Sequence, residues 1–250
     1  MKSMPHYVVV LLYGVGGVSI LLLALKLGSP LLSVLYAPPV PPPVPGTTKI
    51  ACVGDSITYG YRVKRRRENC YPAQLEKLLG KRFSVRNFGA NGRAMQGAAD
   101  LPYWRHKYFK LSGAFDPDVV LIMLGTNDSR KPNWRELGPY LRDYRDMLMH
   151  YRSLPSAPVI YALTPPTEFK LKNRKAVKYG MLKEAVDEMT AGIKNLAAEL
   201  DIEVIDINAA TSSRPEDFSF DGIHANNEGA KYIAETVYAA IRSGVSSSSS

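Results

Sequence analysis

The order of apolar segments from residue 48 onward is the feature that most restricts the fold of this chain. Five short apolar runs are separated there by longer stretches with apolar residues at helical spacing. This alternation is typical of a parallel sheet covered by helices on both faces. The predicted strands are KIACVG at 49–54, SVRNFG at 84–89, DVVLIMLG at 118–125, PVIYALT at 158–164 and IEVIDI at 202–207.

Helices are predicted between these strands. In YPAQLEKLLG at 71–80, Pro72 occupies a first-turn position and Gly80 stands just past the end, which is the usual asymmetry of a helix. Three further stretches carry apolar residues three and four positions apart, and each therefore predicts one amphipathic helix. They are 133–152, 177–200 and 226–242.

The N-terminal 36 residues are predicted to be a membrane anchor or signal segment. Residues 8–25 contain no charge over 18 positions, which at 1.5 Å per residue would cover about 27 Å of a bilayer core. A transmembrane signal anchor is favoured over a cleaved signal peptide, whose apolar region is usually shorter. We therefore expect a membrane-anchored protein with its folded domain in a lumenal, extracellular or periplasmic space. Secretion after cleavage is the alternative.

Composition shifts mark the other boundaries of the chain. Between residues 37 and 46, seven of ten residues are Pro or Gly, which favours a semi-rigid extended linker over 37–47. The folded domain is expected to span 48–243. The Ser-rich segment 244–250 has almost nothing apolar to bury, so it is expected to be a disordered tail.

Charge and cysteine content exclude several classes of protein. The net charge of +9 comes from basic residues spread along the chain without a nucleic-acid-binding motif, so no nucleic-acid partner is expected. The two cysteines, Cys52 and Cys70, show no paired spacing for a metal and are too few for a disulfide-rich scaffold. Neither their pairing nor the oligomeric state follows from the sequence.

Polar and glycine-rich segments follow four of the predicted strands. In an open parallel sheet, ligands bind beyond the carboxyl ends of the strands, so these segments should meet at one edge. They are GDSIT at 54–58, GANG at 89–92, GTND at 125–128 and DGIH at 221–224.

The residue types at this edge suit nucleophilic catalysis. Ser56 has a structural alternative, because serine after a strand often caps a helix. Asp221 stands three residues before His224, so its carboxylate can orient one ring nitrogen and leave the other to face the Ser56 hydroxyl. The backbone N–H groups of Ser56 and Gly92 and the side-chain amide of Asn127 are three candidate donors for an oxyanion hole.

These four segments resemble the blocks of the GDSL or SGNH hydrolase superfamily. GDSIT matches the first block through Ser56, NFGANG the second through Gly92, GTND the third through Asn127, and DGIH the last through Asp221 and His224. The resemblance implies a flavodoxin-like three-layer α/β/α sandwich and ester hydrolysis through an acyl-serine intermediate, without a metal or other cofactor. Within the matched blocks, Asp55 and Asp128 are expected to support the site.

The substrate expected from this resemblance is a small-molecule, glycan or lipid ester. YPAQLEKLLG, VRNFGANG and PYW are similar to the carbohydrate acetylesterase branch, close to lysophospholipase-like members, so a short-chain or acetyl ester is favoured. A lipid esterase or a membrane-tethered O-acyltransferase is the alternative, and a non-catalytic binding module is disfavoured by the intact site. Candidate substrate contacts are Lys64, Arg65, Arg66, Arg67, Tyr103 and Trp104.

Two further expectations concern the chemistry of this edge. Because unperturbed histidine titrates near about 6.5, activity should fall below roughly pH 6 as His224 gains a proton. Asn127-Asp128-Ser129 is formally an N-glycosylation acceptor. A glycan and an oxyanion donor cannot share one amide, so we expect Asn127 to be unmodified.

Overall fold

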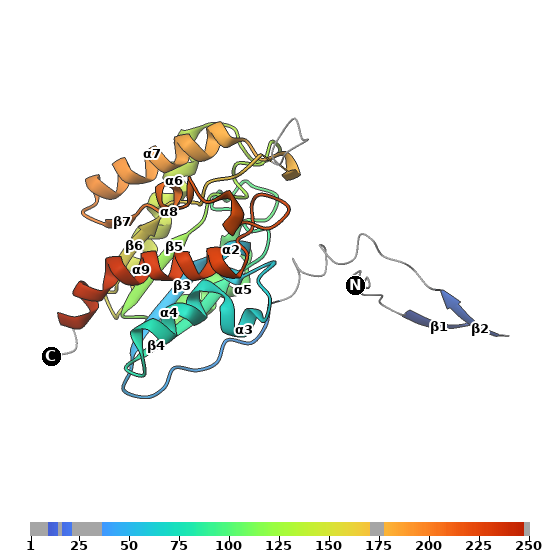
Figure 1. Ribbon diagram of the computed structural model, residues 1–250, viewed down its shortest axis with the longest axis horizontal. Helices are drawn as coiled ribbons and strands as arrows, with labels where there is room; N and C mark the ends of the chain where they lie inside the picture. The colour runs from blue at the N-terminus through green and yellow to red at the C-terminus, as the bar shows by residue number, and fades with distance from the viewer. Residues whose placement is uncertain (1–9, 15–16, 22–36, 171–177, 248–250) are drawn as a thin grey trace. The chain divides into compact units, whose positions relative to one another are not determined.

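The structure is a computed structural model that describes residues 10–14, 17–21, 37–170 and 178–247. Its main unit, from Pro39 to the C-terminus, is built on one five-stranded parallel sheet with the strand order β4-β3-β5-β6-β7 (Figure 1). This order is the flavodoxin-like one that the family resemblance implies. The strands are β3 (Thr48–Gly54), β4 (Phe83–Gly89), β5 (Val119–Met123), β6 (Val159–Leu163) and β7 (Glu203–Ile205).

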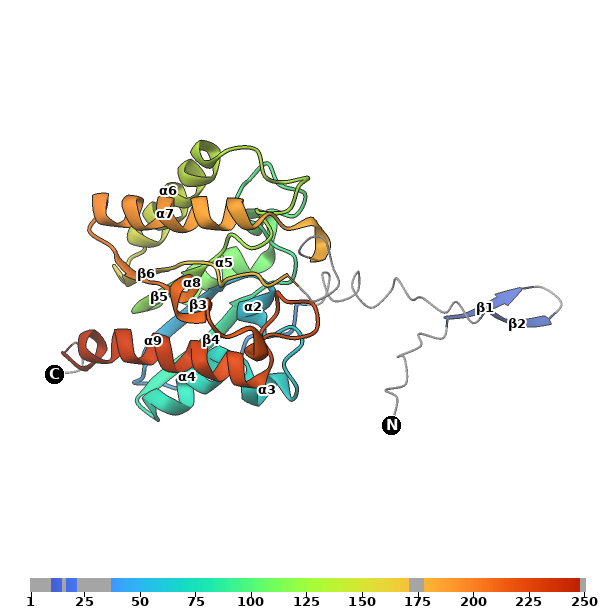
Figure 2. The same ribbon diagram turned by 45° about the horizontal axis from the view of Figure 1, so that its top comes forward.

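Helices cover both faces of the sheet. Figure 2 shows the sheet between α6 (Leu137–Arg152) and α7 (Lys183–Glu199) on one side and α4 (Tyr71–Leu79) and α9 (Asn227–Ser247) on the other. The remaining helical segments are short. They are α2 (Ser56–Tyr59), α3 (Arg66–Asn69), α5 (Lys107–Ala114), α8 (Ile207–Thr211) and the 3₁₀ turns Tyr103–Arg105, Lys178–Gly180 and Pro215–Asp217.

The strands read as continuous apolar runs because both of their faces are buried. Every residue of β5 is buried, and so are the last five residues of β3. The core on the α4 and α9 face includes Ile50, Leu121, Leu75 and Val237. The predicted strands and the predicted three-layer arrangement are therefore confirmed.

Two glycines at strand ends let α2 lie directly against the sheet. A Cβ atom on Gly89 would overlap the backbone of Thr58 and Tyr59, and one on Gly54 would overlap the Thr58 side chain and the Met123 carbonyl. The close approach requires residues without a side chain. These glycines thus fix the position of the segment that carries Ser56.

The Pro-rich segment, expected to be a semi-rigid linker, is hydrogen-bonded to the sheet. Arg86, on the edge strand β4, donates hydrogen bonds to the carbonyls of Pro41 (2.9 Å) and Pro42 (2.7 Å), and Ser84 accepts one from the Val44 N–H (2.9 Å). An extended proline-rich chain makes no internal hydrogen bonds, so its carbonyls are open to such donors. The segment is therefore bound along β4 and belongs to the folded unit.

The N-terminal residues form strands where a transmembrane helix was expected. Strand β1 (Val10–Gly14) pairs antiparallel with β2 (Gly17–Leu21), and Gly14 lies opposite Gly17. Glycine is about 1 kcal/mol less favourable than alanine in a helix, and Val and Ile favour strands, which accounts for the difference locally. Residues 8–9, 15–16 and 22–25 of the predicted span lie outside the described residues. Within the part of the chain that the structure describes, no helix has the length and apolarity needed to cross a bilayer.

The C-terminal boundary also differs from the prediction. Helix α9 continues through Ser247, so residues 244–247 of the predicted disordered tail are helical. The preceding turns of α9 supply carbonyl acceptors for the backbone N–H groups of these residues. Polar residues alone therefore do not end the helix. Residues 248–250 lie outside the described ranges.

Candidate active site

Ser56 is the first residue of α2, immediately beyond the carboxyl end of β3. Asp55, and not Ser56, caps this helix, because its carboxylate accepts the Ile57 N–H at 2.9 Å. The Ser56 side chain is therefore available for another contact. The capping alternative that the sequence left open does not apply to it.

A hydrogen-bonded relay connects three of the predicted site residues. Ser56 Oγ lies 2.9 Å from His224 Nε2, and His224 Nδ1 lies 2.9 Å from Asp221 Oδ2. All three side chains are buried, although Ser56 and His224 come from loops 168 positions apart in the sequence. The arrangement is that of a nucleophile, a base and a carboxylate that orients the base.

The environment of Asp221 keeps it ionised. Its Oδ1 accepts the Ser219 hydroxyl (2.8 Å) and the backbone N–H of Ile223 and of His224. Burial alone would raise the pKa of Asp221, but these hydrogen bonds and the His224 ring outweigh it and hold the pKa well below its usual range. Arg62 adds a positive charge, with Nε 3.5 Å from Oδ2.

Asn127 links the loops that carry the other two candidate oxyanion donors. Its amide nitrogen donates a 3.0 Å hydrogen bond to the Arg93 carbonyl, next to Gly92, and lies 3.5 Å from Asp55 Oδ2, next to Ser56. Gly92 itself has φ +72°, a conformation that suits glycine. The structure thus brings the segments of Ser56, Gly92 and Asn127 together.

Asp128 holds the loop that follows Gly92. Its two carboxylate oxygens accept the backbone N–H groups of Met95 and Gln96, each at 2.8 Å. Ser129, the third residue of the formal glycosylation acceptor, is fully buried, and Asn127 is 7% exposed. This burial supports the expectation of an unmodified amide, which stays a prediction.

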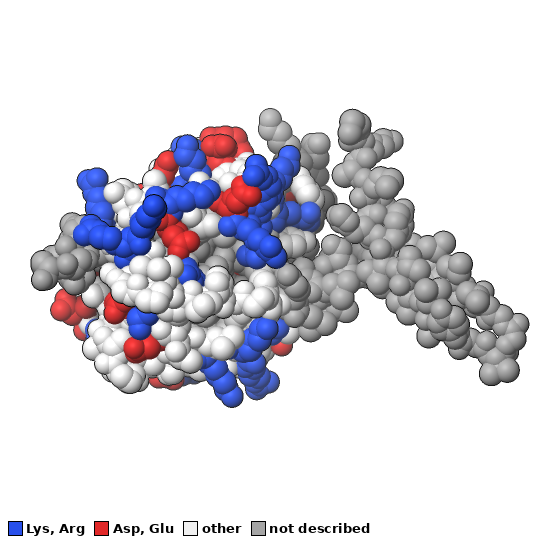
Figure 3. Space-filling view, turned by 90° about the horizontal axis from the view of Figure 1, so that it is seen from below, with Lys and Arg blue, Asp and Glu red and all other residues white. Residues whose placement is uncertain are grey.

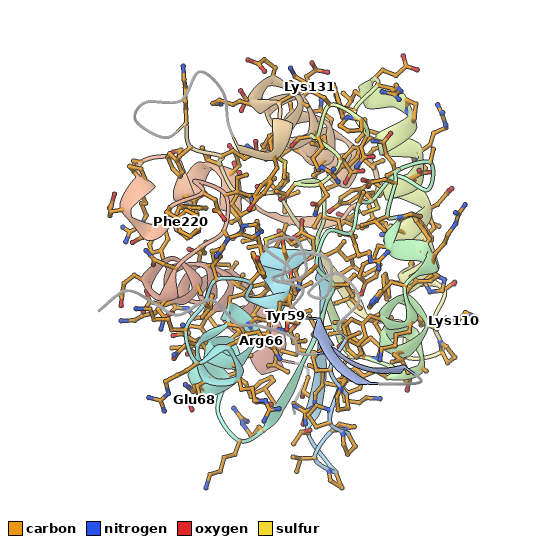
Figure 4. All side chains as sticks on the ribbon, turned by 90° about the vertical axis from the view of Figure 1, so that its right-hand side faces the viewer. Tyr59, Arg66, Glu68, Lys110, Lys131 and Phe220 are labelled. Atoms are coloured by element: carbon orange, nitrogen blue, oxygen red, sulfur yellow. The ribbon has the colours of Figure 1, made fainter. Side chains whose placement is uncertain are left out.

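Of the four basic candidate substrate contacts, Arg66 is packed against the fold and the other three are exposed. Arg66 lies over the Tyr59 ring (4.3 Å) and donates to the Tyr59 carbonyl, whereas Arg65 pairs with Glu68 at 2.6 Å. Figure 4 shows Tyr59 and Arg66 together, well apart from Phe220. Lys64 is exposed, and its backbone N–H is bound by the Asn227 side chain on α9. Arg67 is exposed at the surface.

Of the two aromatic candidates, Tyr103 differs from the expectation. Tyr103 is fully buried and its hydroxyl donates to the Phe88 carbonyl at 2.7 Å, so it cannot form a wall that faces a substrate. Trp104 is half-buried, donates from its indole to the Met95 carbonyl and packs against Phe109.

Charge on the surface is dispersed. On the face shown in Figure 3, Lys and Arg side chains occupy several separate places with Asp and Glu among them. On this face the basic side chains do not form one continuous stripe.

Sequence reasoning missed three residues whose side chains form a line of contacts that begins at His224. The Tyr61 ring lies edge-on to His224 with centroids 4.9 Å apart, and Arg62 is stacked between Tyr61 and Phe220. Tyr61 and Arg62 are close to Ser56 in sequence, and Phe220 precedes Asp221. Proximity to the matched blocks was the only available signal for them.

A group of buried carboxyl side chains lies near Ser56. Burial raises the pKa of Asp55 and of Asp128 to about 7, and that of Glu168 to about 8. Glu168 Oε1 accepts the Ser129 hydroxyl at 3.1 Å, and Oε2 is buried without a hydrogen-bond partner among the described residues. Within those same residues, no three His, Cys, Asp or Glu side chains are grouped to hold a metal ion, and both cysteines are free and buried.

Comparison with known proteins agrees with this geometry. The model of the GDSL-like lipase/acylhydrolase family matches residues 52–232. An acetylxylan esterase from Xylanibacter ruminicola is 33% identical over 223 residues, which cover 81% of this chain and 45% of that protein. A GDSL esterase/lipase from Arabidopsis thaliana is 25% identical over 149 residues, which cover 54% and 58% of the two chains. The chain therefore spans about half the length of the curated relatives that it matches.

Solved structures share the fold. A carbohydrate acetylesterase from Sinorhizobium meliloti superposes with a TM-score of 0.64 at 20% identity, over 79% of this chain and 99% of that one. The aryl esterase of M. smegmatis gives a TM-score of 0.64 at 19% identity, with the same coverage. The fold and the site define an α/β protein with a Ser-His-Asp relay at the carboxyl edge of a flavodoxin-like sheet. Among such proteins, this chain belongs to the GDSL-like lipase/acylhydrolase family.

Proposed function

We propose that the domain hydrolyses short-chain O-acyl esters, acetyl esters above all, with Ser56 as the nucleophile. The observation that carries the proposal is the relay from Ser56 Oγ through His224 to Asp221, with 2.9 Å at both contacts. A hydroxyl, an imidazole and a buried carboxylate in this order are the parts that acyl transfer to serine requires.

The relay accounts for each proton transfer. As Ser56 Oγ attacks the ester carbonyl, His224 Nε2 takes the hydroxyl proton, and it then returns the proton to the departing alcohol. The acyl group is left as an ester of Ser56. Water, deprotonated by the same nitrogen, attacks that ester, and His224 returns the proton to Ser56 Oγ as the acid is released. Asp221 stabilises the imidazolium in each half of the reaction.

The negative oxygen of the tetrahedral intermediate needs fixed donors. The Ser56 N–H lies in the first turn of α2, where backbone N–H groups have no intrahelical partner. Asn127 has one N–H bound to the Arg93 carbonyl, and its nitrogen is 3.5 Å from Asp55 Oδ2, which is long for a good hydrogen bond. The second N–H is therefore the one that a substrate oxygen would take, together with the N–H groups of Ser56 and Gly92.

An acetylated carbohydrate is the substrate class that we propose. The support is the similarity to a relative named as an acetylxylan esterase, together with the family's site residues on this chain. A triad does not select its substrate, so this part of the proposal rests on that similarity.

Attachment to a membrane through residues 8–25 stays a prediction. It rests on the uncharged length of that segment alone. Fractionation of cells that express the full chain tests it: extraction of the protein by detergent and not by high salt or carbonate supports an anchor, and release by salt contradicts it.

The experiment on function compares aryl acetate, butyrate and octanoate with an acetylated xylo-oligosaccharide. The proposal expects the highest kcat/KM on the acetate and release of free acetate from the oligosaccharide. A preference for octanoate would contradict the proposal and indicate a lipid esterase. Transfer of the acetyl group to an added sugar in place of water would contradict it and indicate a transferase.

A further inference from the structure

A continuous stack of side chains runs from His224 to the surface. The Tyr61 ring stands edge-on to His224 at 4.9 Å, with an interplanar angle of 68°. Arg62 follows, with its guanidinium carbon 5.0 Å from the centre of Tyr61 and 4.5 Å from the centre of Phe220. Phe220 forms the outer end and is 65% exposed, so the stack connects solvent to the reacting centre.

Two unfavourable local features are combined in this stack. Arg62 has φ +75°, a left-handed conformation that is strained for a residue with a side chain. Phe220 exposes most of its apolar ring to water. Single exposed apolar residues are common on protein surfaces. Phe220 differs from them because it packs on a strained arginine next to the triad, which indicates a role at the site.

The turn that carries Phe220 is fixed by the catalytic residues. The Ser219 N–H donates to the His224 carbonyl at 2.7 Å, and the Gly222 N–H donates to the Ser219 carbonyl at 2.9 Å. Ser219 Oγ also donates to Asp221. On the other side of the stack, Arg62 Nε lies 3.5 Å from Asp221 Oδ2. Phe220 and Arg62 are therefore held in place relative to the triad and form a preformed surface.

The chemistry of the reaction says which part of an ester meets this surface. His224 Nε2 must reach the leaving oxygen in order to protonate it, so the alcohol portion departs on the His224 side. Tyr61 contacts His224 on that side, Arg62 contacts Asp221, and Phe220 packs on Arg62. The carbonyl oxygen of the acyl group, which is bonded to Ser56, is directed toward Asn127 and Gly92 instead.

We infer that Phe220 and Arg62 form a subsite for a six-membered ring in the alcohol portion of the ester. The apolar face of such a ring would lie on Phe220, and the guanidinium, whose side chain is 31% exposed, would donate hydrogen bonds to oxygens at the ring edge. A pyranose has both features. The inference rests on the proposed ester hydrolysis and names the part of the substrate that decides specificity.

The test compares acetates that differ only in the alcohol, with the full chain and its Phe220→Ala and Phe220→Tyr variants. The esters are ethyl, cyclohexyl, benzyl and 2-phenylethyl acetate, so that a ring is absent, attached directly or placed further away. For Phe220→Ala, we expect KM to rise about three- to tenfold more for at least one ring ester than for ethyl acetate. Phe220→Tyr, which keeps the ring, should restore KM.

The matched control is Leu111→Ala, an exposed apolar residue on α5 that is 45% exposed and is expected to change none of these values. Equal changes for ethyl acetate and all ring esters, or no change for any ring ester, would overturn the subsite. Titration of 2-phenylethanol against ethanol by NMR measures the subsite without turnover, and weaker binding of 2-phenylethanol to Phe220→Ala is expected. Binding that depends on Phe220 in a chain that cleaves no ester would sink the proposed function and leave the subsite standing.

Discussion

The side-chain amide of Asn127 is bonded at 3.0 Å to the Arg93 carbonyl, which ties the exit of β5 to the loop after β4. The same nitrogen lies 3.5 Å from Asp55, the residue before Ser56. One amide therefore lies between segments of three loops that are far apart in the sequence. Its place between the segments of Ser56 and Gly92 is what makes it a candidate oxyanion donor.

Asn127→Ala should reduce catalysis far more than stability. Loss of one oxyanion donor costs about 2.7–4 kcal/mol of transition-state stabilisation, so kcat should fall roughly 10²- to 10³-fold with KM nearly unchanged. Steady-state kinetics with an aryl acetate measures this. Asn69→Ala removes an amide that donates to the Lys64 carbonyl outside the relay and should retain full activity. An Asn127→Ala protein with parental kcat would remove Asn127 from the mechanism.

Asp221→Asn should preserve the fold and reduce kcat by roughly 10⁴-fold, because an amide cannot keep His224 in the required tautomer or stabilise the imidazolium. The pKa of Asp221 is held below its usual range, so mild acid does not reproduce this substitution in the parent protein. Kinetics at pH 5 to 9 should show the loss at every pH. Asp187→Asn, which breaks only an exposed pair with Lys183, is the matched control.

Glu168 should make the free energy of unfolding depend on pH. Its pKa is raised to about 8 by burial, so the unfolded chain releases this proton first and stability falls as the pH rises from about 4.5 to about 8. Glu168→Gln removes this titration, and the slope of stability against pH should become less negative by up to about 1.4 kcal/mol per pH unit. Urea unfolding at pH 5, 6, 7 and 8 measures both slopes. Parallel slopes would show that Glu168 does not titrate in this window.

Gly89→Ala should destabilise the fold by about 3 kcal/mol, since the added methyl group meets backbone atoms of Thr58 and Tyr59 that cannot turn away. Gly138→Ala is the control, because its Cβ meets only the Arg142 side chain at 3.8 Å and alanine favours the helix. Thermal unfolding compares the two. Equal melting temperatures for both variants would contradict the close approach of α2 to the sheet.

The parts of the fold that the sequence predicted are those that local patterns determine. Strands buried on both faces, such as β5, are continuous apolar runs, and the helices show apolar residues at three- and four-residue spacing. The grouping of the candidate catalytic residues was predictable because parallel strands deliver their loops to one edge. The strand order came from the family resemblance and not from periodicity.

The remaining features depend on contacts between distant segments. The stack of Arg62 on Phe220 and the hydrogen bonds from Arg86 to Pro41 join residues more than forty positions apart, and no local pattern encodes them. Tyr103 is an aromatic residue of the type that can contact a substrate, but its hydroxyl donates to the Phe88 carbonyl in the interior. The strand pair β1 and β2 shows that an uncharged run with several glycines does not determine a helix by length alone.

The most direct test of the central claim is mass spectrometry of the protein after rapid acid quench from an aryl acetate. We expect a transient acetyl group on the peptide that contains Ser56. In Ser56→Ala, we expect neither this acetyl group nor turnover. An acetyl group on another residue, or ester hydrolysis that survives Ser56→Ala, would contradict the assignment of Ser56 as the nucleophile.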